Sequence, residues 1–348
     1  MEGLKVKYRI DDSDLITKLH KEYGIQVESV NFIPMGDSAY SYWLKCTNGE
    51  RYYLKLFDHH NDKQRTSVER LPYYLPLTWQ MYHQGLFRNI AYPIKNQSGD
   101  FKTTFIDITV VLFNFIEGET LAAAYPFSKE ILEAIAKSVA LIQKITPFIE
   151  QYTLLTETFD ISFESDLEKC IWMLENTETF DNSIKQALRE LVLAKKEQIF
   201  VLLNLVRKLR GIAIADTNEK VLCHGDIWGG NLIHCESGLY FIDWESAVIA
   251  PPEFDLVGYI GEEFGVFFST YEKHTGKTVT INPDLLRFYA YRHHLRNLTT
   301  WLMNILYRNT EEAQNENDLA MILYHCMNRW DSIEPRVGTV EAWLGNRM

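Results

Sequence analysis

The hydrophobic pattern of the first 115 residues has a period of two, which is typical of strands. Alternating apolar and polar residues predict strands at Val27–Pro34, Ser41–Lys45, Arg51–Phe57, Ile90–Pro93 and Phe105–Phe115. Asn48-Gly49, between the second and third of these, is a strong hairpin signal. The alternation predicts an antiparallel sheet.

Two helices are predicted within the same region. A capped apolar stripe predicts one over residues 12–23, ending at Gly24. The other covers Leu71–Gln84, where Pro72 and Pro76 are expected to break or kink it.

Downstream of residue 115 the period becomes that of helices. Ser128 is positioned to cap a helix over Lys129–Ile145, which Pro147 ends. Further helices are predicted over residues 163–176, 183–211, 253–275, 283–308 and 316–330. We therefore expect an α+β fold with a small antiparallel β-rich lobe over residues 1–115 and a larger, mainly helical lobe over residues 116–348.

Composition limits the classes of function. The chain has 348 residues, 46% of them hydrophobic, so a large core is possible. Its net charge of −12 argues against nucleic acid or an anionic membrane as a partner. No signal peptide is apparent, no apolar run reaches the roughly 18 residues of a membrane span, and the five cysteines are scattered. These features predict a cytoplasmic protein with reduced thiols.

The strongest chemical signal lies in residues 221–245, VLCHGDIWGGNLIHCESGLYFIDWE. Asp226 follows one apolar run, Asn231 comes five residues later, and Asp243 follows a second run. Three oxygen-bearing side chains at strand ends suit a hard cation such as Mg²⁺ and a hydroxyl nucleophile.

The same stretch contains a rival set of metal ligands, namely Cys223, His224, His234 and Cys235. Neighbouring residues on a strand point to opposite faces, so this spacing argues against a shared zinc ion. We expect Cys223 and Cys235 to be buried strand residues.

The motif His224-Gly225-Asp226-Ile227-Trp228-Gly229-Gly230-Asn231, with Phe241-Ile242-Asp243-Trp244-Glu245 after it, resembles the aminoglycoside phosphotransferase and choline kinase superfamily. The resemblance covers most of the chain and is nearest to spectinomycin-type phosphotransferases. It implies a bilobal protein-kinase-like fold and transfer of the γ-phosphate of ATP (or GTP), with Mg²⁺, to a small-molecule hydroxyl.

The resemblance assigns roles to the motif residues. Asp226 orients the acceptor hydroxyl and takes its proton. Asn231 and Asp243 are the Mg²⁺ ligands, and Gly229 with Gly230 permits a tight loop between Asp226 and Asn231. His224 and Asp255 brace this loop.

Lys55 is the candidate for binding the nucleotide phosphates. An ammonium group within the apolar strand Tyr52–Phe57 needs a partner, and the position matches the family lysine that contacts the α- and β-phosphates. The alternative is an outward-facing lysine, because Leu54 and Leu56 share the other face of the strand.

The other nucleotide-binding residues follow from the resemblance. Glu69 is the predicted helix partner of Lys55. Ser38 belongs to the turn that would cover the phosphates, although this turn has one glycine and departs from GxGxxG. The hinge that would bind adenine is Asn114, Phe115 and Ile116.

Two other nucleotide-binding classes are disfavoured. Gly276-Lys277-Thr278 resembles the end of a Walker A loop, but the glycine required at position 271 is Tyr271, so we predict a surface turn. In protein kinases Phe-Gly follows the metal-binding aspartate, whereas here Trp244-Glu245 follows Asp243.

The predicted acceptor is an aminoglycoside or aminocyclitol antibiotic, and the protein is expected to be a monomer or homodimer. Trp228 or Trp301 could stack on a cationic acceptor. Candidate lining residues are Glu164, Asp166, Glu263, His293, His294, Asn297 and Trp301. Because Leu285–Leu306 carries no acidic residue, choline, methylthioribose, homoserine or a sugar stays open. A non-catalytic nucleotide-binding protein is the alternative class, but the full set of Lys55, Asp226, Asn231 and Asp243 favours an enzyme.

Overall fold

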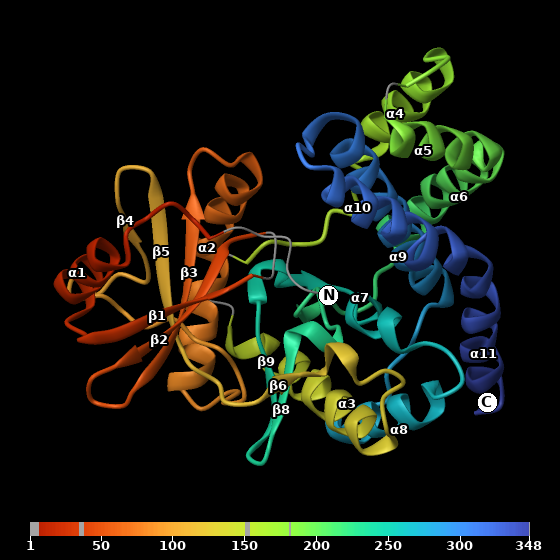
Figure 1. Ribbon diagram of the computed structural model, residues 1–348. Coiled ribbons are helices and arrows are strands. Elements are labelled where there is room, and N and C mark those ends of the chain that lie inside the picture. Colours follow the sequence, from red (N-terminus) through yellow and green to blue (C-terminus); the bar gives the residue numbers. More distant parts are fainter. Residues whose placement is uncertain (1–6, 35–37, 150–153, 181, 348) are drawn as a thin grey trace. The chain divides into compact units, whose positions relative to one another are not determined.

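The computed structural model describes residues 7–34, 38–149, 154–180 and 182–347. The chain forms two compact units (Figure 1), one of residues 1–156 and 221–249 and the other of residues 157–220 and 250–348. The change in hydrophobic period near residue 115 lies inside the first unit. Each unit is described separately below.

The first unit contains an antiparallel sheet with the strand order β1-β2-β3-β5-β4. Its strands are β1 (Val27–Ile33), β2 (Tyr40–Cys46), β3 (Arg51–Asp58), β4 (Thr103–Thr104) and β5 (Ile108–Asn114). The predicted antiparallel region is thus confirmed. The predicted strand at Ile90–Pro93 was wrong, because only isolated bridges form there, from Ile90 to Phe241 and from Pro93 to Phe113.

Two helices cover the two faces of this sheet, as Figure 1 shows. Helix α1 (Asp12–Tyr23) packs Leu15 and Leu19 into an apolar core with Leu54 and Leu56 of β3. Helix α2 (Asp62–His83) contacts β3 as well. Because both faces are covered, Leu54, Lys55, Leu56 and Phe57 are all buried. The outward-facing alternative for Lys55 is therefore wrong.

Helix α2 runs without a break through Pro72 and Pro76, contrary to the expectation from sequence. An interior proline costs about 3 kcal/mol. The buried face of α2 includes Leu71, Leu75, Leu77 and Met81, and burying each such side chain contributes about 1.5–3 kcal/mol. Packing on the sheet therefore outweighs the loss of the two helical hydrogen bonds.

The rest of the first unit supports the loop that follows β7 (Val221–Cys223). Strand β7 pairs with β10 (Val248–Ala250), and a small sheet has the order β6-β8-β9. The strands of the small sheet are β6 (Glu119–Thr120), β8 (Leu232–Cys235) and β9 (Gly238–Phe241). Helix α3 (Lys129–Lys144) begins after Ser128, as predicted, with the Ser128 hydroxyl accepting the N–H of Ile131, and contacts β7.

The second unit is helical and is organised around α9 (Pro283–Met303), which contacts α4, α6, α7, α10 and α11. Its other helices are α4 (Glu164–Asn176), α5 (Ser183–Ala194), α6 (Lys196–Ala215), α7 (Glu253–Leu256), α8 (Phe264–Thr275), α10 (Glu312–His325) and α11 (Ile333–Gly345). No helix among the described residues is long and apolar enough to cross a membrane.

The predicted boundaries in this unit were partly wrong. The single helix expected over residues 183–211 is α5 and α6, which meet at Lys195. Apolar residues continue at helical spacing from Val192 to Ile199, so the pattern does not reveal the break. The helix expected over residues 253–275 is divided into α7 and α8, and α11 was not predicted.

Glu253 is a fully buried carboxyl group in α7. Its Oε1 accepts the backbone N–H of Asn282, the N-cap residue of α9, at 2.8 Å, while its Oε2 has no hydrogen-bond partner. Burial raises the pKa of Glu253 from 4.5 to about 7, although the hydrogen bond from Asn282 opposes this rise. The native state therefore binds this proton more tightly than the unfolded chain does.

The free energy of unfolding should fall as pH rises from 4.5 to 7, because the unfolded chain releases this proton first, and should level off above 7. Glu253→Gln should remove this fall and stabilise the protein at pH 8 by up to about 3 kcal/mol. Urea unfolding of both proteins at pH 5, 6, 7 and 8 measures the effect. Glu262→Gln, an exposed control, should follow the wild type, and an E253Q protein that did so too would contradict the prediction.

Candidate active site

The loop after β7 brings Asp226 and Asn231 together. The side-chain amide of Asn231 donates hydrogen bonds to Oδ2 of Asp226 at 2.8 Å and to its backbone carbonyl at 2.9 Å. Asn231 is 7% exposed, whereas Asp226 lies on the surface. A buried amide thus orients an exposed carboxylate, which is the arrangement that a general base needs.

Close contact between backbones requires glycine at two positions in this loop. Gly225 has φ +85°, and a Cβ there would lie 2.3 Å from the carbonyl oxygen of Ser246. A Cβ on Gly229 would lie 2.3 Å from the carbonyl oxygen of Leu121. Both neighbours are backbone atoms and cannot rotate away, so a larger residue would displace the loop.

His224 joins the two motifs and is completely buried. Its Nε2 bonds to the carbonyl oxygen of Ile242 at 3.0 Å, and the N–H of Asp226 donates to its Nδ1 at 3.3 Å. These contacts fit a neutral ring, and burial lowers the pKa of His224 to about 4. Its ring also packs against Trp244, with centroids 4.6 Å apart.

These contacts also argue against the zinc alternative. Both ring nitrogens of His224 face hydrogen-bond partners within the loop, Cys223 is buried and His234 is exposed. Over the described part of the chain, no three His, Cys, Asp or Glu side chains gather into a metal site.

Asp243 forms an ion pair with the buried Lys55 of β3. The distance from Nζ to Oδ1 is 2.6 Å, and Lys55 is 7% exposed. Burial by itself lowers the pKa of Lys55, but the Asp243 carboxylate, with smaller contributions from Tyr74 and Glu245, holds it well above its ordinary value. Lys55 is therefore a fixed cation next to Asp243. Asp243 has a left-handed backbone conformation (φ 61°), which is uncommon outside glycine.

The predicted pair between Lys55 and Glu69 is not formed. Glu69 is an exposed residue of α2, and the ion-pair partner of Lys55 is Asp243 instead. The buried stripe of α2 includes Ser67, Leu71 and Tyr74, and position 69 lies off this stripe. Among the described residues, Glu69 makes no contact that supports a role in nucleotide binding.

Glu245 is a carboxylate near Lys55 and Asp243, and no role was predicted for it. Burial raises its pKa, and the nearby charge of Asp243 adds to the rise, while Lys55 and a hydrogen bond with Ser38 oppose it. Its Oε2 is buried without a hydrogen-bond partner. The available signal was its position two residues after Asp243 in the FIDWE segment.

The side-chain oxygens of Asn231, Asp243 and Glu245 suit a divalent cation. The amide nitrogen of Asn231 donates to Asp226, which leaves the amide oxygen to act as a metal ligand. Asp243 and Glu245 supply carboxylates. An uncompensated buried carboxylate oxygen such as Oε2 of Glu245 is stabilised when a cation approaches it. The residues present therefore fit the predicted Mg²⁺.

The remaining predicted nucleotide residues lie at one end of β5 and in the turn before β2. The side-chain oxygen of Asn114 accepts the N–H of Tyr92 at 2.7 Å, so this amide shapes the hinge. Phe115 lies under the Arg51 guanidinium, 4.6 Å from the ring centroid, and Ile116 is half-buried. Met35–Asp37 of the phosphate turn lie outside the described residues. Binding of adenine at this hinge stays a prediction.

Tyr125 was not singled out by the sequence. Its hydroxyl accepts the N–H of Gly229 at 2.8 Å, and its ring stacks on Phe127 with centroids 4.2 Å apart. Together with Leu121, which packs against Gly229, it fixes the turn between Asp226 and Asn231. No sequence rule connects residue 125 to residue 229, because their contact depends on the fold.

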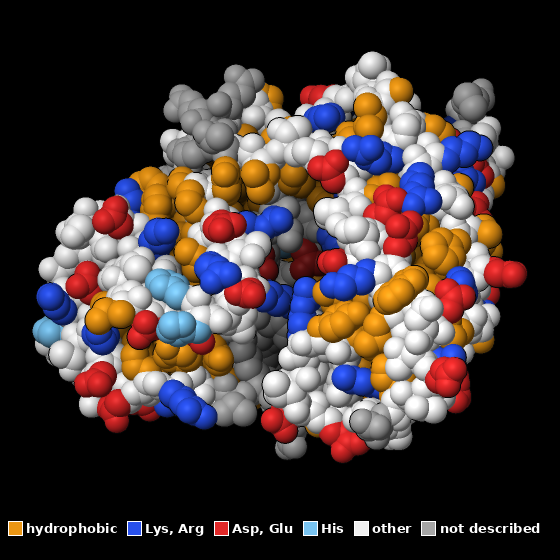
Figure 2. Space-filling model, turned by 90° about the horizontal axis from the view of Figure 1, so that it is seen from above, with side chains coloured by type: hydrophobic (Ala, Val, Ile, Leu, Met, Phe, Trp, Pro, Cys, Tyr) orange, Lys and Arg blue, Asp and Glu red, His pale blue; other side chains and the backbone are white. Residues whose placement is uncertain are grey.

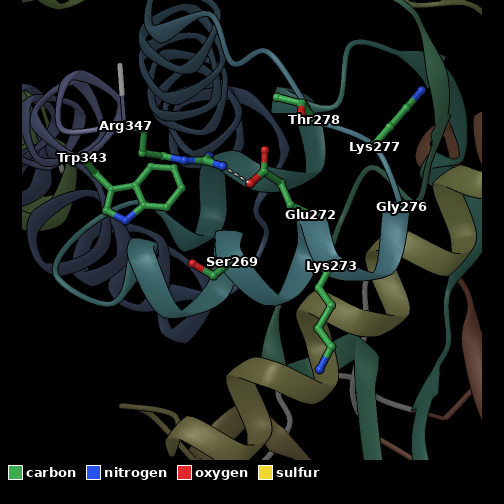
Figure 3. Close-up of a pocket in the computed structure, with 8 residues that line it drawn as sticks. All are labelled: Ser269, Glu272, Lys273, Gly276, Lys277, Thr278, Trp343 and Arg347. Carbon is green, nitrogen blue, oxygen red and sulfur yellow. Dashed lines mark hydrogen bonds and ion pairs between the residues drawn. The ribbon is translucent and has the colours of Figure 1, made fainter.

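Gly276-Lys277-Thr278 is an exposed turn, as predicted. Gly276 ends α8 with φ 74°, and the Thr275 hydroxyl donates to the carbonyl oxygen of Lys277 at 3.1 Å. This turn borders an open depression of about 510 Å³ (Figure 3). Arg347 pairs with Glu272 within its lining, Lys277 pairs with Glu219, and Lys273 points away from both pairs.

The candidate acceptor residues of the second unit are partly engaged in other contacts. Glu164 pairs with Arg207, and His293 bonds to Asn297 at 3.0 Å. Arg292 forms a two-point ion pair with Glu157, and both are largely buried. On the face seen in Figure 2, acidic and basic side chains are interspersed with apolar ones.

This geometry defines a kinase-type phosphotransferase: a buried lysine paired with an aspartate, and an amide-held carboxylate in the loop that follows a strand. The model of the phosphotransferase enzyme family, APH, matches residues 29–289, and the chain belongs to this family.

Three relatives show how far the similarity reaches. The chain is 23% identical to protein StrN of Streptomyces griseus over 233 residues, which are 64% of this chain and 67% of StrN. Spectinomycin phosphotransferase, solved with ADP and spectinomycin, superimposes with a TM-score of 0.70 at 19% identity, covering 90% of this chain and 93% of that one. An amicoumacin kinase solved with AMP-PNP, Ca²⁺ and its substrate superimposes with a TM-score of 0.56 at 16% identity, covering 90% of this chain and 93% of that one. The predicted fold is confirmed.

Tyr125→Phe should lower the turnover number by about two- to tenfold and leave the KM for ATP unchanged. The lost hydrogen bond is worth about 0.5–1.5 kcal/mol and holds the loop rather than the nucleotide. Steady-state kinetics with varied ATP measures both constants. Tyr324→Phe, at an exposed tyrosine, is the control. Equal losses in Y125F and Y324F, or an effect on ATP affinity alone, would contradict the positioning role.

Proposed function

We propose that the protein transfers the γ-phosphate of ATP, with Mg²⁺, to a hydroxyl group of an aminocyclitol or aminoglycoside antibiotic. The observation that carries the proposal is the coexistence of two pairs, Lys55 with Asp243 and Asn231 with Asp226. The first is built for nucleotide phosphates and their cation, and the second for a hydroxyl nucleophile.

The reaction follows from these positions. The oxygen of the acceptor hydroxyl attacks the γ-phosphorus while Asp226 accepts the hydroxyl proton. The bond between the γ-phosphorus and the β,γ-bridging oxygen breaks, and ADP is released. The buried amide of Asn231 keeps the Asp226 carboxylate directed outward. Lys55 holds positive charge beside the phosphates. Mg²⁺, when bound by Asn231, Asp243 and Glu245, would neutralise developing charge.

Similarity to the spectinomycin enzyme over 90% of this chain supports an aminocyclitol as acceptor. The amicoumacin kinase has the same fold and a different antibiotic substrate, so the fold alone does not choose the acceptor. Choline, methylthioribose, homoserine and sugars remain the alternative small alcohols. A screen of ATP consumption over spectinomycin, aminoglycosides and these compounds tests the proposal. Tight ATP binding with no consumption above background would favour the non-catalytic alternative.

Asp226→Asn should reduce phosphoryl transfer by at least about a hundredfold, because general-base catalysis typically contributes about 10²–10⁴. The KD for ATP should change little, because Asp226 lies in the loop that faces the acceptor. Coupled ADP-release assays and ATP titration calorimetry measure the two quantities. Asp216→Asn, at another aspartate that bonds an asparagine side chain, is the matched control. Wild-type turnover in D226N would disprove the assignment of the base.

A further inference from the structure

Trp228 lies within the catalytic loop and is 49% exposed. The backbone N–H of Trp228 donates to the carbonyl oxygen of Asp226 at 3.2 Å. The backbone carbonyl oxygen of Trp228 accepts the N–H of Asn231 at 2.9 Å. The backbone that carries the indole is therefore fixed to both Asp226 and Asn231. Any group bound on the indole would be held at a defined place relative to the Asp226 carboxylate.

Gly230 makes room for the indole. A Cβ at position 230 would lie 2.2 Å from both Cη2 and Cζ2 of Trp228. The ring thus lies against the glycine backbone, and Trp228 as a whole stays 49% exposed. A Cβ at position 230 would push the indole out of this position.

The surroundings of Trp228 distinguish two kinds of ligand. Sites for quaternary ammonium groups enclose the cation with several aromatic faces. Within the described part of the chain, no second aromatic ring is in contact with the ring of Trp228. A single open, flat surface fits the flat face of a ring, which it can cover by offset stacking or with C–H groups.

We propose that the open face of Trp228 binds the ring of the acceptor that carries the reactive hydroxyl, so that the substrate is a cyclic polyol or aminocyclitol rather than an acyclic amino alcohol. This inference rests on the proposed phosphotransfer and adds a specificity-determining residue to it. Asp226 supplies the base, and Trp228 sets which hydroxyl of the ring lies next to it.

Acceptor kinetics of Trp228→Ala and Trp228→Phe provide the first test. For a cyclic acceptor, W228A should raise the KM by about three- to tenfold, W228F should recover most of this loss, and the KM for ATP should stay unchanged in both. Trp172→Ala, at a more exposed tryptophan (65%) of α4, should match the wild type. A wild-type preference for choline or homoserine, or an unchanged KM in W228A, would overturn the inference.

Tryptophan fluorescence separates this inference from the proposed function, because it needs no turnover. In the presence of ADP, spectinomycin or another cyclic ligand should quench the wild-type emission, W228F should lose this quenching, and W172F should keep it. Binding with equal quenching in W228F and wild type, or no binding at all, would overturn the stacking role. Quenching through Trp228 without phosphorylation of any ligand would instead refute the proposed function and leave a cyclic-ligand site.

Discussion

The ion pair between the buried Lys55 and Asp243 is the constraint on which the site depends. It joins β3 to the segment after β9, across 188 residues of sequence. Removing Asp243 would leave Lys55 as an uncompensated buried charge, which costs several kcal/mol. The pair also explains why a lysine is tolerated on a strand buried on both faces. Asp243 accepts an uncommon left-handed backbone conformation at this position, which places its carboxylate next to Lys55.

The second constraint is backbone packing around the catalytic loop. Gly225 lies against Ser246, Gly229 lies against Leu121, and the neutral ring of His224 bridges Asp226 and Ile242. These contacts bring two segments to the loop, one around Leu121 and the other from Ile242 to Ser246, so the orientation of Asp226 depends on both. The hydroxyl of Tyr125 adds a hydrogen bond from a segment about a hundred residues upstream. Rigid placement of the base is therefore a property of the whole first unit.

The two halves of the proposed reaction differ in how they are encoded. Phosphate and cation chemistry needs a few fixed charges, and relatives with different substrates share the fold that holds them. In our proposal, acceptor choice depends on surfaces such as the open face of Trp228, where the polarity and shape of individual side chains decide. Gly230 is informative in this respect, because a Cβ there would overlap the indole in its present position.

The sequence alone determined the antiparallel sheet, most helices and the position of Asn231 beside Asp226, because each depends on local periodicity or on spacing within one short segment, and the resemblance of its motifs indicated the family. Tertiary structure decided the rest. Packing on the sheet kept α2 continuous through Pro72 and Pro76, and the register of α2 pointed Glu69 to solvent, so that Lys55 pairs with Asp243. The positions of Glu245 and Tyr125 near the site, and the burial of Lys55, depend on contacts between segments that are distant in the sequence. Contacts of this kind leave no periodic signal in the chain, since they are set by how its elements pack.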